Sequence, residues 1–248
     1  MKRLIRHIAV FLFLLTVFSC KKTSVTDCFK STGKVTTEDR AITGFHTVVL
    51  HDNINLVLES SATNNLTIEA GDKLMKKIVA EVNDSVLTIS NNNSCNWVRS
   101  YDVPVTAYLN FTQLDTIEYR SIGNITSTDT IRTDNLVIDV KEGAGEIRFA
   151  VNAVFLHCNL HFGTADIKMK GHCNVCYVYS NSFGLIDNRA LITDFVYLNN
   201  RSSNDVYVYA HKTLGVTIEN IGNVYYTGNP FDITLDQKGT GELIKLED

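Results

Sequence analysis

The sequence predicts an all-β protein: a single-stranded parallel β-helix, or β-solenoid, with coils of about 20 residues and a more irregular β-rich N-terminal part. Three observations predict it. Short apolar motifs recur about every 20 residues through the second half of the chain. Within them, apolar and polar residues alternate with the period of two that strands require. Asn and Thr, which favour turns and strands, make up 23 and 25 of the 248 residues.

The composition excludes several classes of protein. With 44% hydrophobic and 20% charged residues and a formal net charge of −4, the chain is neither disordered nor collagen-like, and it is not a multi-span membrane protein. A chain of 248 residues can bury a sizeable core in one elongated domain or two compact ones. No linker or charge block divides the sequence, so we expect residues 28–248 to form one unit.

The first nineteen residues resemble a bacterial lipoprotein signal peptide. Basic residues at positions 2, 3 and 6 precede an apolar run over residues 8–18, which is too short to span a bilayer stably. Ser19 then precedes Cys20, as in a lipobox, in which the cysteine thiol is acylated and becomes the first residue after cleavage. The alternative is an ordinary secretory signal in which Cys20 is incidental.

We therefore expect residues 1–19 to be removed and residues 20–27 to form a lipidated tether to the outer membrane, with the protein at the cell surface or facing the periplasm. Lys21, rather than Asp, follows the lipid cysteine, which is consistent with outer-membrane sorting. Cleavage removes three basic and no acidic residues, so 20 Lys and Arg remain against 27 Asp and Glu, a net charge of −7. A domain this acidic is a poor partner for nucleic acid.

Five cysteines follow the predicted lipid cysteine, in a compartment that permits disulfides. Cys28 lies before the first strong strand and Cys95 lies in an Asn-rich turn, so these two form the predicted bridge, with two unpaired thiols as the alternative. The bridge would close a loop of 66 intervening residues and add about 4 kcal/mol in the chain-entropy model. Because five is odd, at least one thiol stays free.

The first part of the domain, residues 28–121, shows strands without a clear repeat. Its apolar runs alternate between Asn, Asp and Gly turns, and one stretch over residues 72–77 could form a helical turn. We expect this part to be irregular and to cap the solenoid. The predicted strands cover residues 45–50, 54–58, 66–69, 78–82, 86–89, 103–111 and 114–119.

The regular part, residues 122–248, carries two interleaved motifs. In the first, a small residue and a polar residue precede a branched apolar one; in the second, two apolar residues flank an outward position. This repeat is too short for a propeller blade and lacks the helices of a leucine-rich repeat, so we expect stacked parallel coils, with the small residue facing inward beside a bend. The apolar members of the first motif are Ile125, Ile147, Ile167, Ile186, Val206, Val224 and Leu243, and the second motif begins at Leu136, Val154, Cys176, Val196, Val216 and Ile233.

The middle positions of the second motif predict an exposed strip. Phe155, Tyr177 and Tyr197 would stack there, and because exposed ring faces on a rigid sheet can stack on sugar rings or dock a partner, these three form the candidate binding face. The alternative is that the rings stabilise the sheet or lie beneath a loop. The inward-facing position two residues after the second motif is polar in several coils, at a predicted corner. We expect Asn200 and Asn220, which occupy it, to be structural and to form an amide ladder between coils.

The sequence offers no catalytic residues and no cofactor motif. It lacks the nucleophile elbow, the phosphate-binding loop, the dinucleotide fingerprint and the His-Glu-x-x-His motif. Its outward columns show no compact group of carboxylates of the kind that glycosidases use. A cluster of potential zinc ligands remains. The alternation predicts that two of its cysteines, Cys158 and Cys176, face inward, so we expect them to be core residues and expect no metal. The cluster comprises His157, Cys158, His161, His172, Cys173 and Cys176.

Several short motifs resemble those of one bacterial family. They are Arg40-xxxx-Phe45-xx-Val48, Asn53-Ile54-Asn55-Leu56, Asp84-xx-Leu87-x-Ile89, the repeated small-x-Ile/Val triplets, the segment from Gly222 to Pro230, and Gly239-x-Gly241. Together they are similar to the putative auto-transporter adhesin, head GIN domain family, a domain of unknown function in secreted and lipid-anchored proteins common in Bacteroidetes. The resemblance covers nearly the whole mature chain, although the tripeptide Gly-Ile-Asn itself is absent. It implies a β-helical surface or periplasmic protein with an adhesin role and no catalytic residues to carry over.

The repeat and the resemblance together predict a lipid-anchored, non-catalytic binding module that presents a rigid β-helix face to a glycan or another envelope partner. Two other classes stay open. One is a carbohydrate-active β-helix enzyme, which turnover of polysaccharides would identify. The other is a purely structural envelope protein, for which no ligand would be found.

Overall fold

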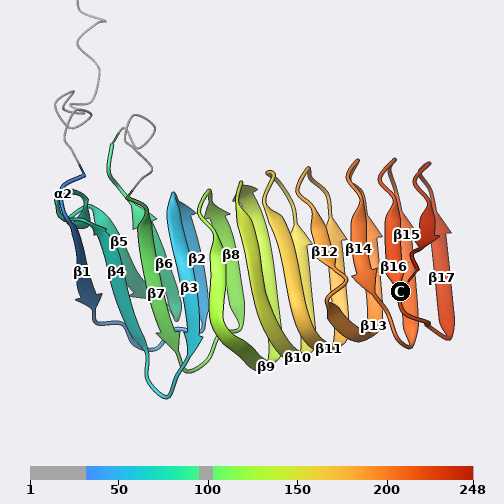
Figure 1. Ribbon diagram of the computed structural model, residues 1–248, viewed down its shortest axis with the longest axis horizontal. Coiled ribbons are helices and arrows are strands. Elements are labelled where there is room, and N and C mark those ends of the chain that lie inside the picture. Colours follow the sequence, from blue (N-terminus) through green and yellow to red (C-terminus); the bar gives the residue numbers. More distant parts are fainter. Residues whose placement is uncertain (1–31, 95–102, 248) are drawn as a thin grey trace, which may run out of the picture.

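The protein is an elongated β-solenoid, and the part of the chain that the structure describes contains one short helix (Figure 1). The computed structural model describes residues 32–94 and 103–247. Strands stack along one axis, from a broad N-terminal end to a last coil at the C-terminal end, so the predicted fold class is confirmed. In this part of the chain, no helix has the length and apolar character needed to cross a membrane.

The elements follow the predicted strands closely. The helix forms where the sequence predicted a helical turn, and one strand, β1, was not predicted because its side chains are polar and exposed. The N-terminal elements are β1 (Val35–Arg40), β2 (Thr47–Asp52), β3 (Ile54–Ser60), β4 (Asn65–Gly71), α2 (Asp72–Met75), β5 (Ile78–Asn83), β6 (Val86–Asn91), β7 (Val105–Phe111) and β8 (Thr116–Ser121). The regular coils contain β9 (Ile125–Gly143), β10 (Glu146–Leu160), β11 (Asp166–Ser180), β12 (Ile186–Asn188), β13 (Leu191–Asn200), β14 (Val206–Tyr209), β15 (Thr213–Ile218), β16 (Val224–Thr227), β17 (Asp232–Gln237) and β18 (Leu243–Lys245).

The first motif forms a continuous inward column. Its seven branched residues, from Ile125 to Leu243, pair in register from coil to coil through parallel strands, in the predicted order. The first six are fully buried. Burying a side chain of this size contributes about 1.5–3 kcal/mol, so this column is a main source of stability along the whole axis.

The second motif is also in register, but two of its rows were aligned wrongly in the sequence. The row in β10 begins at Leu156, two residues after the predicted Val154. The row in β15 begins at Leu214, two residues before the predicted Val216. A shift of two residues leaves every side chain on the same face of the sheet, so alternation alone cannot detect it.

The small residue of the first motif is required by the close approach of consecutive coils. A Cβ atom on Gly123, Gly184 or Gly222 would lie 2.0, 1.9 or 2.2 Å from a backbone carbonyl oxygen of the preceding coil in the stack. No larger side chain fits without moving the backbone. The predicted lack of room for a large side chain is confirmed at these three corners, whereas the coil that leads into β14 carries Asn204 at this position.

The polar residue of the first motif forms a hydrogen-bond ladder between coils, at a different position from the predicted amide ladder. The side-chain oxygen of Asn124 accepts a hydrogen bond from the backbone N–H of Glu146 (2.9 Å), and that of Asp205 accepts one from Asn223 (2.9 Å). Each bond satisfies a backbone donor at a bend, where strand pairing is interrupted. Three further bonds of the same kind join Asn55 to Asn124, Asp166 to Leu185 and Asn223 to Glu242.

The predicted amide ladder of Asn200 and Asn220 is wrong in its second member. Asn200 pairs with Ile218, whereas Asn220 is exposed in the following turn. Asn200 is fully buried, and its Nδ2 donates to the carbonyl oxygens of Asn204 (3.1 Å) and Gly222 (3.0 Å). It therefore has the structural role expected of it, as a buried cap on a corner. Two other members of its column donate to the carbonyl four residues later: Tyr119 to Gly123 (2.6 Å) and Gln237 to Gly241 (3.0 Å).

The N-terminal part stacks out of sequence order. The coil made by β2 and β3 lies between β6 and β7 on one side and β8 and β9 on the other. Beyond that coil, β4 pairs antiparallel with β7 and with β1, and β5 pairs antiparallel with β6. These antiparallel strands cover the N-terminal end of the solenoid, as expected of the irregular part.

The corner amides give a testable difference in stability. We expect Asn200→Ala to lower the free energy of unfolding by about 1–3 kcal/mol, because buried carbonyls lose their donor. Asn220→Ala is the matched control, since this exposed amide donates only to the Arg201 carbonyl (3.1 Å), and it should change stability by no more than about 0.5 kcal/mol. Urea unfolding followed by circular dichroism measures both. Equal losses would contradict the capping role.

Candidate functional site

The exposed aromatic strip has a different first member from the one predicted. Tyr177 and Tyr197 pair in register, and their rings stack with centroids 5.6 Å apart. The ring before them is His157, which pairs with Tyr177 and stacks on it at 4.8 Å. Phe155 lies two residues earlier along β10, in register with Val175. The predicted alignment of β10 was wrong by two residues, which leaves each side chain on the same face. Phe155 therefore still faces outward, and it is 40% exposed.

The ladder of His157, Tyr177 and Tyr197 ends at a hollow, because the next residue of this column is a glycine. After Tyr197, the next members of this column are Gly215 and Thr234. A Cβ atom on Gly215 would lie 3.1 Å from Cδ1 of Tyr197, so the ring leans over the glycine. The hollow beside it has a volume of about 530 Å³. Since Tyr197 is 44% exposed, part of its ring surface is open to a ligand there.

Polar side chains border this hollow along the neighbouring outward column. Asn199 is oriented by a hydrogen bond from its Nδ2 to Oε1 of Glu219 (3.0 Å), and Arg201 binds the other oxygen of that carboxylate (3.2 Å). Amide, hydroxyl and carboxylate groups together can donate to and accept from the hydroxyls of a polar ring. The rim residues, in order of coil, are Asn159, Tyr179, Asn199, Thr217 and Asp236.

The histidine of the ladder is uncharged at neutral pH. Partial burial lowers the pKa of His157 below its ordinary value, so its imidazole is neutral near pH 7. A ligand in the hollow therefore meets uncharged ring surface, with the charged groups confined to the rim.

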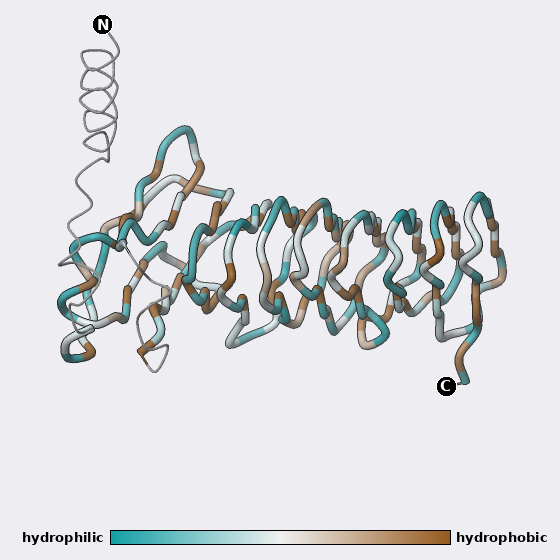
Figure 2. The backbone as a smooth tube through the Cα atoms, turned by 90° about the horizontal axis from the view of Figure 1, so that it is seen from above, coloured by the Kyte–Doolittle hydropathy of each residue, from teal (hydrophilic) through white to brown (hydrophobic). Residues whose placement is uncertain are grey.

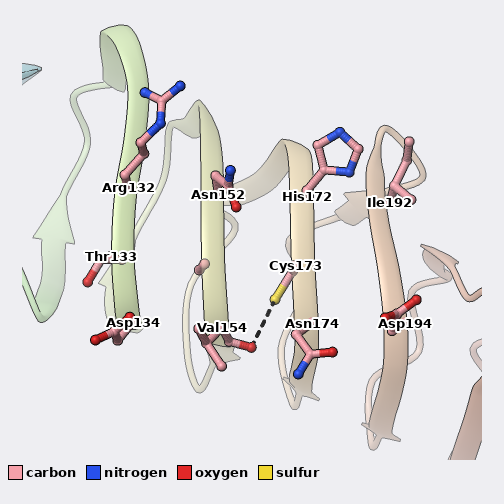
Figure 3. A pocket seen from close by; sticks show the side chains of 11 residues that line it. Arg132, Thr133, Asp134, Asn152, Val154, His172, Cys173, Asn174, Ile192 and Asp194 are labelled. Carbon is pink, nitrogen blue, oxygen red and sulfur yellow. Dashed lines mark hydrogen bonds between the residues drawn. The ribbon is translucent and has the colours of Figure 1, made fainter.

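A second concavity, the polar groove, crosses four coils at a bend (Figure 3). Its volume is about 870 Å³. Small side chains form its floor because this column turns inward: Thr133, Ala153 and Cys173. The two walls are outward columns on either side of that floor. One carries Arg132, Asn152, His172 and Ile192, and the other carries Asp134, Val154, Asn174 and Asp194.

The carboxylates of the polar groove are far apart. Asp194 is held by Lys212 (2.9 Å) and His211 (3.0 Å), and these hydrogen bonds, that of Lys212 first, lower the pKa of Asp194. Asp134 lies three coils away, which is about 14 Å at a strand spacing of about 4.8 Å. Glycosidases hold their two carboxylates about 5–9.5 Å apart. These two side chains therefore cannot act as such a pair.

The sequence matches one protein family over most of its length. A family model described as "Putative auto-transporter adhesin, head GIN domain" matches residues 44–230. The chain belongs to this family. The resemblance indicated by the short motifs is thereby confirmed, and a head GIN domain described as an adhesin is a module of the cell surface or envelope. No relative among curated proteins matches the chain.

Crystal structures of similar proteins share the fold of this head GIN domain. A "putative adhesin" from Bacteroides fragilis has a TM-score of 0.78 at 20% identity, covering 86% of this chain and 97% of that chain. A "putative adhesin" from Parabacteroides merdae has a TM-score of 0.63 at 17% identity, covering 88% and 98%. A "putative lipid binding protein" from Parabacteroides distasonis has a TM-score of 0.65 at 17% identity, covering 87% and 98%. At these identities the likeness concerns the fold alone.

The potential zinc ligands of this head GIN domain point to opposite sides of its sheet. Cys158, Cys173 and Cys176 are buried free thiols. In contrast, His157 belongs to the outward ladder and His172 lines the polar groove. Over residues 32–94 and 103–247, no group of three His, Cys, Asp or Glu side chains could hold a metal ion.

Three cysteines with predicted roles lie outside the described residues. They are Cys20, the predicted lipid attachment site, and Cys28 and Cys95, the predicted bridge. Both assignments stay predictions, as does a binding role for the three aromatic residues proposed from the sequence.

Sequence reasoning missed Gly215 and the polar groove. A glycine inside a strand pattern signals a bulge or a close approach, and Leu214-Gly215-Val216 carries that signal. The groove gives a weaker signal, because it depends on a bend at which two consecutive residues, Val154 and Phe155, both face outward. An alternating pattern does not reveal where such a bend falls.

The buried thiols should be unreactive in the folded protein. Burial raises the pKa of Cys173 to about 12, and the hydrogen bond to Cys158, together with burial, raises the pKa of Cys176. Because the thiolate is the reactive form, alkylation of these cysteines by iodoacetamide should stay slow from pH 7 to about pH 10. In urea it should accelerate as pH rises toward the ordinary cysteine pKa of about 8.5. Peptide mass spectrometry separates them from the other cysteines, and native labelling of Cys173 that rises through pH 8–9 would contradict its burial.

Proposed function

We propose that the chain is a lipid-anchored envelope protein whose solenoid binds glycans in the hollow beside Tyr197. The observation that carries the proposal is the end of the aromatic ladder, where the Tyr197 ring borders an open hollow with polar groups on its rim. Flat ring surface packs against the apolar face of a sugar, while side-chain amides and hydroxyls bond its hydroxyl groups. Few polar groups around an apolar platform are typical of small-molecule sites.

The rigidity of the solenoid supports this function. The ladder residues stand on β10, β11 and β13, each of which is paired on both sides, so their backbone does not have to be ordered by a ligand. On the rim, Asn199 is already oriented by Glu219. Preorganised contacts reduce the entropy lost on binding, which is how a shallow site can reach useful affinity. The adhesin names of the family and of two neighbours also favour binding over a reaction.

Phe155 lies on β10 between a wall residue of the polar groove and the first residue of the aromatic ladder. It directly follows Val154 in the wall of the polar groove and precedes the ladder residue His157 by two positions. A glycan chain longer than the hollow would run from the Tyr197 ring past Phe155 toward the groove. This gives all three aromatic residues predicted from the sequence a place on the proposed surface, although only two of them stack.

The binding surface is tested with a glycan and matrix-protein screen, followed by variants. We expect Tyr197→Ser to weaken binding about tenfold, because loss of a stacked ring costs about 1–1.5 kcal/mol. Gly215→Gln should weaken it further by filling the hollow. Tyr225→Ser is the control, since Tyr225 stacks on Tyr207 (4.9 Å) on a different outward column.

The screen has a clear negative outcome. If replacing Phe155, Tyr177 and Tyr197 together by serine leaves every detected interaction unchanged, the assigned surface is wrong. If no glycan or matrix protein binds and polysaccharide is cleaved instead, the protein is an enzyme rather than a binding module.

The lipid anchor is tested independently of the ligand. We expect Cys20→Ser to move the protein from the membrane fraction to the soluble fraction of the envelope and to abolish incorporation of an alkyne-labelled fatty acid, because the acylated thiol is gone. Cys28→Ser is the control and should keep both the label and the membrane association. Protease treatment of intact cells then distinguishes the cell surface from the periplasmic face. Unchanged fractionation and labelling of Cys20→Ser would contradict lipidation at this residue.

A further inference from the structure

The C-terminal end of the solenoid is open. β17 is the outermost strand of its sheet in Figure 1, and all six of its residues are exposed. It pairs with β15 on one edge, and on its other edge the described residues supply no strand. The N-terminal end differs, because antiparallel strands cover it.

The inward side chains of the last coil are uncovered at this end. Ile233 and Leu235 continue the core columns of Leu214 and Val216, which are buried. They are nevertheless 43% and 44% exposed. A strand edge that carries apolar side chains and unpaired backbone groups is a template for pairing with another chain. In Figure 2, none of the described segments lies beyond the last coil at this end.

We propose that this end binds the same end of a second copy of the chain, forming a two-fold symmetric, end-to-end dimer. The two β17 strands pair antiparallel, with the two-fold axis at Leu235. The unpaired backbone groups of each edge are then satisfied by the other copy, and the core columns continue across the interface. An interface that uses the same patch on both partners closes after two copies, so it produces a dimer and not a fibre.

The charges of the edge are complementary in this register. With the axis at Leu235, Asp232 of each copy lies opposite Lys238 of the other, which gives two symmetric ion pairs across the strands. An axis one residue earlier, at Thr234, would put Asp232 opposite Asp236, and an axis at Asp236 would put that carboxylate opposite itself. Within one chain Lys238 binds Asp236 (2.9 Å), so in the dimer its ammonium group would lie between Asp236 of its own chain and Asp232 of the other.

The proposal is tested by sedimentation of the purified full chain over a range of concentrations. We expect a reversible dimer, with Asp232→Lys and Lys238→Asp each raising the dissociation constant at least tenfold, because each substitution places like charges opposite each other twice. The double variant, D232K with K238D, should restore dimerisation. This restoration cannot result from unfolding of the last coil.

A second variant tests the position of the axis. Leu235→Lys should abolish the dimer, because the two new ammonium groups would face each other. Ile122→Lys is the control: Ile122 is 54% exposed at a corner far from this end, and its variant should dimerise normally. A wild-type chain that is monomeric at every concentration overturns the proposal, and so does a dimer that ignores the charge reversals. Glycan binding is not needed for either result, so the two proposals fail separately.

Discussion

Each coil of the solenoid satisfies its backbone hydrogen bonds with the coils on either side of it, and the rest of the structure depends on this constraint. Strand spacing fixes the step between coils at about 4.8 Å. Successive coils must therefore follow nearly the same path, and residues at equivalent positions form columns. Inward columns need branched apolar residues, corners need small ones, and bends need a side chain that accepts the unpaired N–H of the next coil.

This constraint also explains how far the sequence could predict the fold. The inward column from Ile125 to Leu243 was predicted completely because the same burial acts on every coil. The predicted alignment of the second motif was wrong at Val154 and Val216, because a pattern that alternates with a period of two is unchanged by a shift of two residues. The N-terminal order could not be predicted at all. Nothing in the local pattern of β2 and β3 indicates that the later strands β6 and β8 pair on either side of them.

The candidate surface was predicted in part for a related reason. The stacking of coils places few constraints on outward-facing residues. The sequence therefore shows which residues face solvent, but not which of them contact one another on adjacent coils. Tyr177 and Tyr197 were identified correctly as a stacked pair, whereas His157 was considered only as a potential zinc ligand. Gly215 contrasts with the corner glycines. A Cβ atom there would meet a side-chain ring at 3.1 Å and no backbone atom closer, so the stack itself does not demand glycine.

The position of the hollow along the solenoid determines how far it lies from a membrane-anchored end. If Cys20 holds the N-terminal end at a membrane, the hollow beside Tyr197 lies toward the far end, where β15 and β17 supply its wall. The proposed dimer joins two such far ends, so its two lipid anchors lie at opposite ends of one rigid rod. A dimer of this geometry connects two membranes more readily than two molecules in the same membrane. Thr234 lines the hollow and belongs to β17, the strand that pairs in the proposed dimer. A ligand in the hollow and a second copy at the edge therefore contact the same strand, so each would influence the binding of the other.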